Sequence, residues 1–188
     1  NQKLDRFSNM CGFSMLFMRT LEAYEKDIFS QPEFLNKFQT RKLLSRKIQK
    51  NTIFTGSGDS LVSAMLAEVF SNYLVRSFDP LDLIKNKSIL KKKTVYFISI
   101  SGNTISNIKV AKITKKSIAI TSNPKSKLAN ICNKSIILKS PNSDVFTAGS
   151  ISFLESALTC ISLVKHISIP KNSRIFEKAL IDAKKSIL

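Results

Sequence analysis

The sequence predicts an α/β fold in which N-terminal helices precede a three-layer, doubly wound, five-stranded parallel sheet. Short segments rich in β-branched residues alternate with longer segments of helical periodicity, which is the pattern of βαβ units. The clearest strand, residues 94–100, has the continuous β-branched character of a strand that is buried on both faces of a parallel sheet. A chain of 188 residues buries roughly 70% of its unfolded surface, which is enough for one such domain.

Each element can be placed along the chain by its pattern. Residues 1–50 are expected to be helical, because apolar side chains recur at helical spacing on both sides of Pro32, and the second helix is expected to carry Phe34 through Leu44 with an interruption near Thr40. Strands are predicted where short apolar runs end in polar loops, at 52–54, 75–78, 94–100, 117–121 and 136–138. Helices are predicted between and after them, at 61–74, 103–115, 124–131, 147–166 and 173–188.

These elements are expected to form a single domain over residues 1–188. It would comprise a helical part at 1–50, a sheet core at 51–166 and a C-terminal helix at 167–188. The segment 61–74 is apolar on nearly all sides, with Ser63, Glu68 and Asn72 as polar exceptions. Because a surface helix of a monomer has a polar face, we expect this helix to be buried and to pack partly against a second copy of the chain.

The composition argues against several classes of protein. The three cysteines are far apart and the chain has one histidine, so neither a disulfide framework nor a metal site is expected, and no cofactor is predicted. The cysteines lie in apolar segments, where free thiols behave as small core residues. No apolar run approaches the ~20 residues of a membrane span. The apolar stretch at 10–18 lacks the cleavage site of a signal peptide, so a cytoplasmic protein is expected.

The formal net charge of +17 predicts attraction to anions, from sugar phosphates to nucleic acid. Basic residues gather at 37–50 and at 85–93. Only Phe38 lies among them as an aromatic residue on which a base could stack. We therefore favour a solvated, lysine-rich surface over a nucleic-acid interface as the interpretation of these runs.

Three polar loops follow predicted strands, at 56–60, 99–104 and 121–124. In a doubly wound sheet, ligands bind beyond the carboxyl ends of the strands, and each of these loops leads into a helix whose first N–H groups attract an anion. The hydroxyls of Ser99, Ser101 and Thr104 would add hydrogen bonds, and Gly102 would allow close approach of the backbone. Any one loop can equally be read as a helix N-cap, but three together at one edge favour an anion site.

The hexapeptide Ser-Ile-Ser-Gly-Asn-Thr at 99–104 resembles the phosphate loop of the sugar isomerase (SIS) domain family. The similarity extends over residues 52–164 and includes the loops at 56–60 and 121–124. This resemblance implies an SIS-like, flavodoxin-type sheet, a phosphorylated sugar as the ligand and a homodimer or homotetramer. By motif match it assigns the phosphosugar to Ser57, Ser99, Ser101, Gly102, Asn103, Thr104, Ser150 and Ser152.

Aldose–ketose isomerisation requires a general base that moves a proton between C1 and C2 of the sugar, and the family uses a carboxylate for this step. Glu155 and Glu68 are the candidates, with His166 as a candidate for assisting ring opening. Glu155 ranks first because its helix would start beside the 99–104 loop. Glu68 lies more than two turns along its helix, so it would serve only the site of another subunit. A phosphosugar-binding module without chemistry is the alternative function.

Overall fold

The computed structural model describes residues 20–139, 149–169 and 173–187. Internal contacts divide the chain into two compact units. One unit holds the sheet and comprises Phe38–Ser140 and Ser152–Ser168. The other unit comprises Asn1–Lys37, Pro141–Ile151 and Ile169–Leu188, and it is largely helical where it is described. The expected single domain therefore stays a prediction, and each unit is treated separately below.

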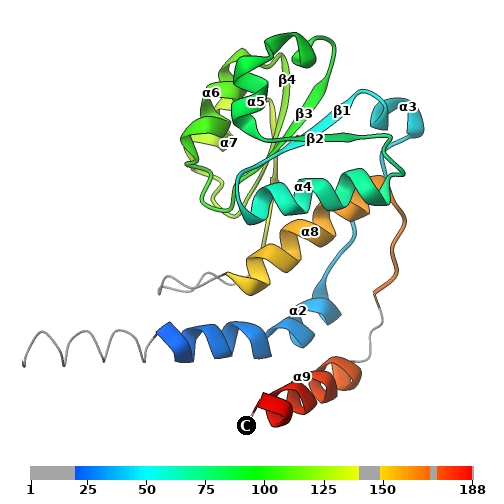
Figure 1. The fold of residues 1–188 in the computed structure, drawn as a ribbon, viewed down its shortest axis with the longest axis vertical. Coiled ribbons are helices and arrows are strands. Elements are labelled where there is room, and N and C mark those ends of the chain that lie inside the picture. The colour runs from blue at the N-terminus through cyan, green and yellow to red at the C-terminus, as the bar shows by residue number, and fades with distance from the viewer. Residues whose placement is uncertain (1–19, 140–148, 170–172, 188) are drawn as a thin grey trace, which may run out of the picture. The chain divides into compact units, whose positions relative to one another are not determined.

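The sheet unit contains five parallel strands in the order β2-β1-β3-β4-β5 (Figure 1). The strands are β1 (Thr52–Thr55), β2 (Arg76–Phe78), β3 (Thr94–Ile98), β4 (Lys116–Thr121) and β5 (Lys134–Ile137). The chain adds β2 to one side of β1 and all later strands to the other, which is the flavodoxin-type order with its topological switch between β1 and β3. The predicted five-stranded parallel sheet is thus confirmed.

Helices cover both faces of this sheet (Figure 1). Side chains that alternate along the strands divide the core in two, because successive residues of a strand point to opposite faces. Phe54, Tyr96 and Ile120 pack with α4 (Asp59–Phe70) and α8 (Ser150–Val164). On the other face, Ile53, Val95 and Ala119 pack with α5 (Pro80–Lys85), α6 (Ile105–Ile113) and α7 (Lys127–Ile131). The three-layer arrangement is therefore also confirmed.

Two short elements complete this unit. The helix α3 (Arg46–Gln49) precedes β1, and the 3-10 helix η1 (Lys87–Leu90) precedes β3. In the other unit, residues 20–29 are helical, and α2 (Gln31–Lys37) packs against α9 (Ser173–Ile187). The predicted beginning of the long helix at Thr147 lies outside the described residues.

The helix expected through Leu44 ends earlier than predicted, because α2 stops at Lys37 and residues 38–45 form no regular element. Backbone N–H groups in this segment donate to residues of α8 instead of forming the hydrogen bonds of a helix. The N–H of Leu44 donates to the carbonyl of Leu163 at 2.8 Å, and the N–H of Arg41 donates to Ser162 Oγ at 3.1 Å. These partners lie more than a hundred residues away in sequence, so local periodicity could not predict them.

The cysteines within the described residues, Cys132 and Cys160, are free and buried. Burial raises the pKa of both thiols, so they stay protonated and serve as small core residues, as expected. Cys11 lies outside the described part of the chain. Within the described ranges, no helix has the length and apolarity to cross a membrane, and no three potential metal ligands lie together.

The helix α4 is buried on one face only, through Ser63, Ala64 and Ala67. Within one chain, the helix is therefore only partly buried, and it ends at Phe70 rather than at the predicted Leu74. Val62, Met65 and Val69, spaced by three and four residues, are 44–51% exposed and form an apolar row along the helix. The expectation that a second copy covers this row stays a prediction.

We expect the chain to sediment as a homodimer or homotetramer at micromolar concentration. A Met65→Gln/Val69→Gln variant should raise the dissociation constant at least about tenfold, because each buried apolar side chain contributes roughly 1.5–3 kcal/mol. The free energy of unfolding of the isolated subunit should change little, since both positions are exposed within the chain. Analytical ultracentrifugation decides the point. A monomeric wild-type protein, or unchanged assembly of the variant, would contradict it.

Candidate functional site at the carboxyl edge of the sheet

The loops after β1 and β3 lie side by side at the carboxyl edge of the sheet, because these two strands are hydrogen-bonded neighbours. The hydroxyl of Ser57, in the β1 loop, lies 3.4 Å from that of Ser106, in the first turn of α6. The two loops flank the topological switch of the sheet, where doubly wound proteins bind their ligands. This edge is therefore the candidate site.

The 99–104 loop forms a tight turn that its own hydroxyls hold together. Ser99 is buried, and its Oγ lies 2.9 Å from Thr104 Oγ1 and accepts the N–H of Gly102 at 3.2 Å. Ser101 Oγ accepts the N–H of Asn103 at 3.3 Å, and both of these residues are exposed. Ser99 and Thr104 thus fix the shape of the loop, and Ser101 and Asn103 present their polar groups to solvent.

The helices at the switch point begin without a side-chain cap. Thr104 is the N-cap of α6 and its side chain makes no bond to the first turn, and Gly58, the N-cap of α4, has no side chain that could do so. By contrast, Asp79 caps α5 through Leu81 N at 2.8 Å, and Ser126 caps α7 through Ala129 N at 3.2 Å. The first N–H groups of a helix need an acceptor from outside it. The uncapped ends of α4 and α6 are thus suited to an anion.

Gly102 makes the turn possible in two ways. Its φ of +66° lies in the left-handed region that glycine tolerates best. A Cβ at this position would also overlap the Cβ and Oγ of Ser126 and lie 2.9 Å from Thr121 Oγ1. The carbonyl of Gly102 accepts the N–H of Leu128 at 3.0 Å, so the loop is packed directly against the start of α7. No other residue fits here without movement of the backbone.

The third predicted loop, at 121–124, supports the site rather than adding hydroxyls to it. The hydroxyls of Thr121 and Ser122 both donate to the carbonyl of Ile100, at 2.9 and 2.8 Å. The side-chain oxygen of Asn123 accepts the N–H of Lys125 at 3.0 Å. These groups are engaged within the fold, so they hold the 99–104 loop in place.

Asn107 is a supporting residue that the sequence did not single out. Its side chain is fully buried, and its Nδ2 donates to the carbonyl of Ile98 at 3.0 Å, one residue before the 99–104 loop begins. Its Oδ1 is buried without a partner among the described residues. Asn107 is the third residue of α6, in its first turn, so its residue type alone gave no signal of this contact.

Replacing Asn107 by alanine should lower the free energy of unfolding by about 1–3 kcal/mol, because the buried carbonyl of Ile98 would lose its donor. Asn86→Ala is the matched control, since Asn86 Nδ2 also donates to a backbone carbonyl, that of Asp82 at 3.2 Å, but in an exposed position. Its effect should stay within about 0.5 kcal/mol. Urea unfolding measures both variants, and equal losses would show that Asn107 does not anchor the loop.

Glu155, the first candidate base, is 3% exposed on α8. Its Oε1 accepts the N–H of Lys139 at 2.7 Å, just beyond the end of β5. The adjacent Ser156 bonds through its hydroxyl to Ser63 of α4 at 2.9 Å, and Ser63 lies one turn from the start of that helix. Both contacts put Glu155 near the carboxyl edge of the sheet, the same edge that carries the 99–104 loop.

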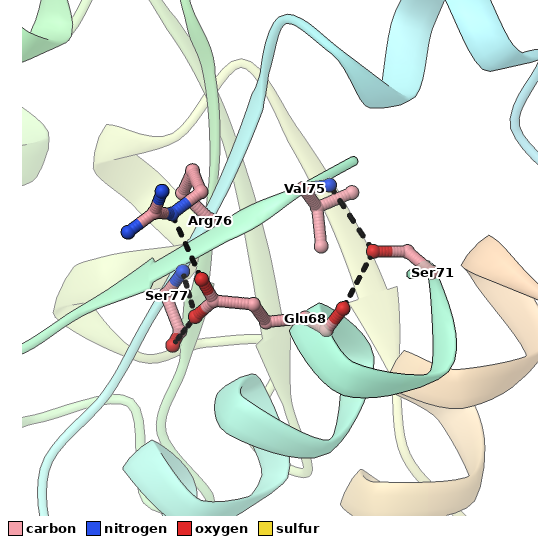
Figure 2. Close-up of polar contacts among 5 residues, drawn as sticks. All are labelled: Glu68, Ser71, Val75, Arg76 and Ser77. Atoms are coloured by element: carbon pink, nitrogen blue, oxygen red, sulfur yellow. Dashed lines mark hydrogen bonds and ion pairs between the residues drawn. The ribbon is translucent and has the colours of Figure 1, made fainter. Parts of the chain in front are cut away.

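Glu68, the second candidate, is engaged in the fold at the edge strand β2 (Figure 2). Its Oε1 pairs with Arg76 Nε at 2.8 Å, and its Oε2 accepts both the N–H of Ser77, at 3.0 Å, and the hydroxyl of the same residue. Ser77 pairs with Phe54 in the middle of the neighbouring strand, not at its carboxyl end. In this chain, Glu68 therefore ties α4 to β2 and is not brought to the loop.

His166 lies at the opposite edge of the sheet. It is exposed and follows the end of α8 at Val164. The carbonyl of Val164 accepts Gln49 Nε2 at 3.0 Å, and Gln49 comes three residues before β1 begins. The end of α8 is thus at the amino edge of the strands, and His166 does not meet the 99–104 loop within this chain.

The predicted serines at the start of α8 differ in their surroundings. Ser150 Oγ donates to Asp27 Oδ2 at 2.7 Å, and the N–H of Ile151 donates to the same oxygen at 3.0 Å. Asp27 therefore caps α8 from the helix at 20–29, a role that its place in an apolar helical stripe did not reveal. Ser152, in the sheet unit, is half-buried.

Comparison with known proteins supports this fold. No protein-family model matches the chain, and no curated protein matches its sequence. The C-terminal domain of glucosamine-fructose-6-phosphate aminotransferase from Francisella tularensis matches at 18% identity and a TM-score of 0.52, over 85% of this chain and 52% of that one. The Vibrio vulnificus NanR protein complexed with ManNAc-6P matches at 13% identity and a TM-score of 0.51, over 89% of this chain and 65% of that one.

A candidate sugar-phosphate isomerase from Listeria monocytogenes matches over nearly the whole of both chains, 90% of this one and 91% of the other, at 16% identity and a TM-score of 0.50. At such identities the matches establish the fold and not the activity. The resemblance stated from the Ser-Ile-Ser-Gly-Asn-Thr motif is thereby confirmed at the level of the fold, and the chain has the SIS-like, flavodoxin-type architecture.

Proposed function

We propose that this chain binds a phosphorylated sugar at the carboxyl edge of its sheet and catalyses aldose–ketose isomerisation there. The phosphate would lie on the 99–104 loop, bonded by Ser101, Asn103 and Thr104 and by the first N–H groups of α6. Ser57 would approach it from the neighbouring loop. Ser99 and Gly102 would keep the loop in its binding shape.

The observation that carries the proposal is the pair of uncapped helices at the switch point, next to hydroxyls from both loops. A dianionic phosphate satisfies several N–H and O–H donors at once, and helix N-termini favour its charge. A neutral sugar would leave those N–H groups poorly matched. Two proteins of similar fold agree with this ligand class, because the Francisella protein is a glucosamine-fructose-6-phosphate aminotransferase and the Vibrio protein is complexed with ManNAc-6P.

The chemical step is assigned to Glu155. A buried carboxylate near the strand ends suits a base that takes a proton from one sugar carbon and returns it to the next. The N–H of Lys139 orients the carboxylate, which would act on the sugar. Glu68 and His166 are not included, because their contacts place them at β2 and at the amino edge of the sheet.

A phosphosugar-binding module without chemistry is the second candidate. It is favoured by the position of His166, because the sole histidine of the chain is not available in this subunit as an acid for ring opening. The two functions share the same phosphate site and differ only in turnover.

Thermal-shift measurements with pentose, hexose and amino-sugar phosphates, each paired with its unphosphorylated sugar, test the binding. We expect stabilisation by a phosphorylated member of at least one pair and none by its neutral partner. Each ligand that binds is then followed by proton NMR for conversion to its aldose or ketose isomer. Stabilisation without conversion would support the binding module, and equal response to neutral sugars would overturn both functions.

A further inference from the structure

Six lysines line a cavity of about 490 Å³ at the amino edge of the sheet. They come from two neighbouring turns, one from η1 into β3 and one from α6 into β4. Its lining is Lys87, Lys91, Lys92, Lys93, Lys115 and Lys116, together with Leu90 and Ile113. Because β3 begins at Thr94 and reaches the 99–104 loop at its other end, the cavity and the proposed sugar site are separated by a strand of about 16 Å.

The charge in this cavity is not balanced by the surrounding chain. Residues 83–143 contain thirteen lysines and neither aspartate nor glutamate. Within the described residues, no lysine of the cavity takes part in an ion pair. Six like charges around one hollow repel one another, and a bound polyanion would relieve that repulsion.

Lys92 shows backbone strain at the centre of this group. Its φ is +60°, in the left-handed region that glycine or asparagine occupies more readily than lysine does. The turn is closed by the N–H of Lys93, which donates to the carbonyl of Leu90 at 3.2 Å. Strained residues of this kind concentrate at functional sites. Lys92 is the middle one of three consecutive lysines in the lining of the cavity.

Lys93 is held in place by a specific contact. Its Nζ donates to the carbonyl of Lys50 at 2.9 Å, which orients one cationic side chain of the cavity before any ligand arrives. Lys50 follows α3 and is itself exposed. This contact brings the second basic run of the sequence, 85–93, against the end of the first, 37–50.

We propose that this cavity binds a chain of linked phosphates, either a free oligophosphate or the phosphate chain of a nucleotide. Its volume is that of a small-molecule site, and lysines recognise phosphate as point charges without demanding one geometry. The lining offers no aromatic side chain on which the bases of a nucleic acid would stack. Leu90 and Ile113 provide a small apolar area beside the charges.

The test is calorimetric titration of the full chain with tripolyphosphate, ATP and orthophosphate at fixed ionic strength. Tripolyphosphate should bind at least about tenfold more tightly than orthophosphate, since it engages several lysines together. A Lys91→Gln/Lys92→Gln/Lys116→Gln variant should lose at least about tenfold of that affinity. If ATP binds more tightly than tripolyphosphate, the ligand is the phosphate chain of a nucleotide. If ATP binds equally tightly or more weakly, the ligand is a free oligophosphate.

The control variant Lys26→Gln/Lys178→Gln/Lys185→Gln removes the same charge from exposed positions elsewhere. Its affinity for tripolyphosphate should stay within about twofold of the wild-type value, because it changes only the long-range electrostatic potential of the protein, which salt screens. Lys92→Gly should weaken binding while leaving the melting temperature unchanged or raised, since glycine relieves the strain at φ +60°. Equal losses in both triple variants, or preference for a short RNA duplex over tripolyphosphate, would overturn the proposal.

Discussion

Replacing Gly102 by alanine is expected to lower the free energy of unfolding by about 2–6 kcal/mol and to abolish binding of the sugar phosphate. Two costs add. A non-glycine residue at φ +66° is strained by about 1–3 kcal/mol. Its Cβ would also overlap Ser126, and overpacking of this kind costs about 1–3 kcal/mol. Urea unfolding gives the stability, and calorimetry with the best ligand gives the binding.

Two further variants separate these costs. Gly58→Ala introduces a Cβ at φ +59° with nothing within 4 Å, so it should show the backbone cost without the overlap. Ser126→Gly removes the two atoms that would lie nearest to the new Cβ and leaves only Thr121 Oγ1, at 2.9 Å. Glycine is nearly as good an N-cap as serine. A double-mutant cycle should therefore show Ser126→Gly restoring about 1–3 kcal/mol to the Gly102→Ala protein. Additive effects of the two substitutions would contradict the packing described for this loop.

Glu155→Gln is expected to lower kcat by about two to four orders of magnitude while the affinity for the sugar phosphate changes little. Glutamine keeps the shape of the side chain and can still accept the N–H of Lys139, but it cannot take a proton from the sugar. The measurement is the rate of isomer exchange by NMR, together with calorimetric binding of the same ligand.

Glu68→Gln is the matched control, because the chemical change is the same at a position bound to Arg76 and Ser77. We expect it to cost about 1–3 kcal/mol of stability, since a charge-assisted contact is lost, and to leave kcat unchanged. A fall in kcat for Glu68→Gln, with none for Glu155→Gln, would reverse the assignment. No turnover in the wild-type protein would favour the binding module.

The sheet and its order of elements could be predicted because their signals are local. Continuous β-branched segments and the polar loops that end them marked all five strands to within about two residues. The 99–104 loop was likewise recognisable, because its residue types have direct chemical meaning next to a helix start. Its closure by Ser99 and Thr104 joins residues only five apart.

What escaped prediction depends on partners far away in the sequence. Residues 38–45 bond to α8, and Asp27 caps α8. Sequence periodicity predicts which face of an element is apolar, but it does not predict hydrogen bonds between segments that are distant in the sequence. For the same reason, the sequence did not show that the hydroxyls of the 121–124 loop bond to the carbonyl of Ile100.

The central claim, that a phosphosugar is held by the 99–104 loop, is tested most directly by a crystal structure with the best ligand of the thermal-shift panel. We predict its phosphate within hydrogen-bond reach of Ser101 Oγ, Thr104 Oγ1 and the first N–H groups of α6, with the sugar directed toward Glu155. A loop without ligand, with the sugar phosphate bound at the lysine cavity or elsewhere, would contradict the account.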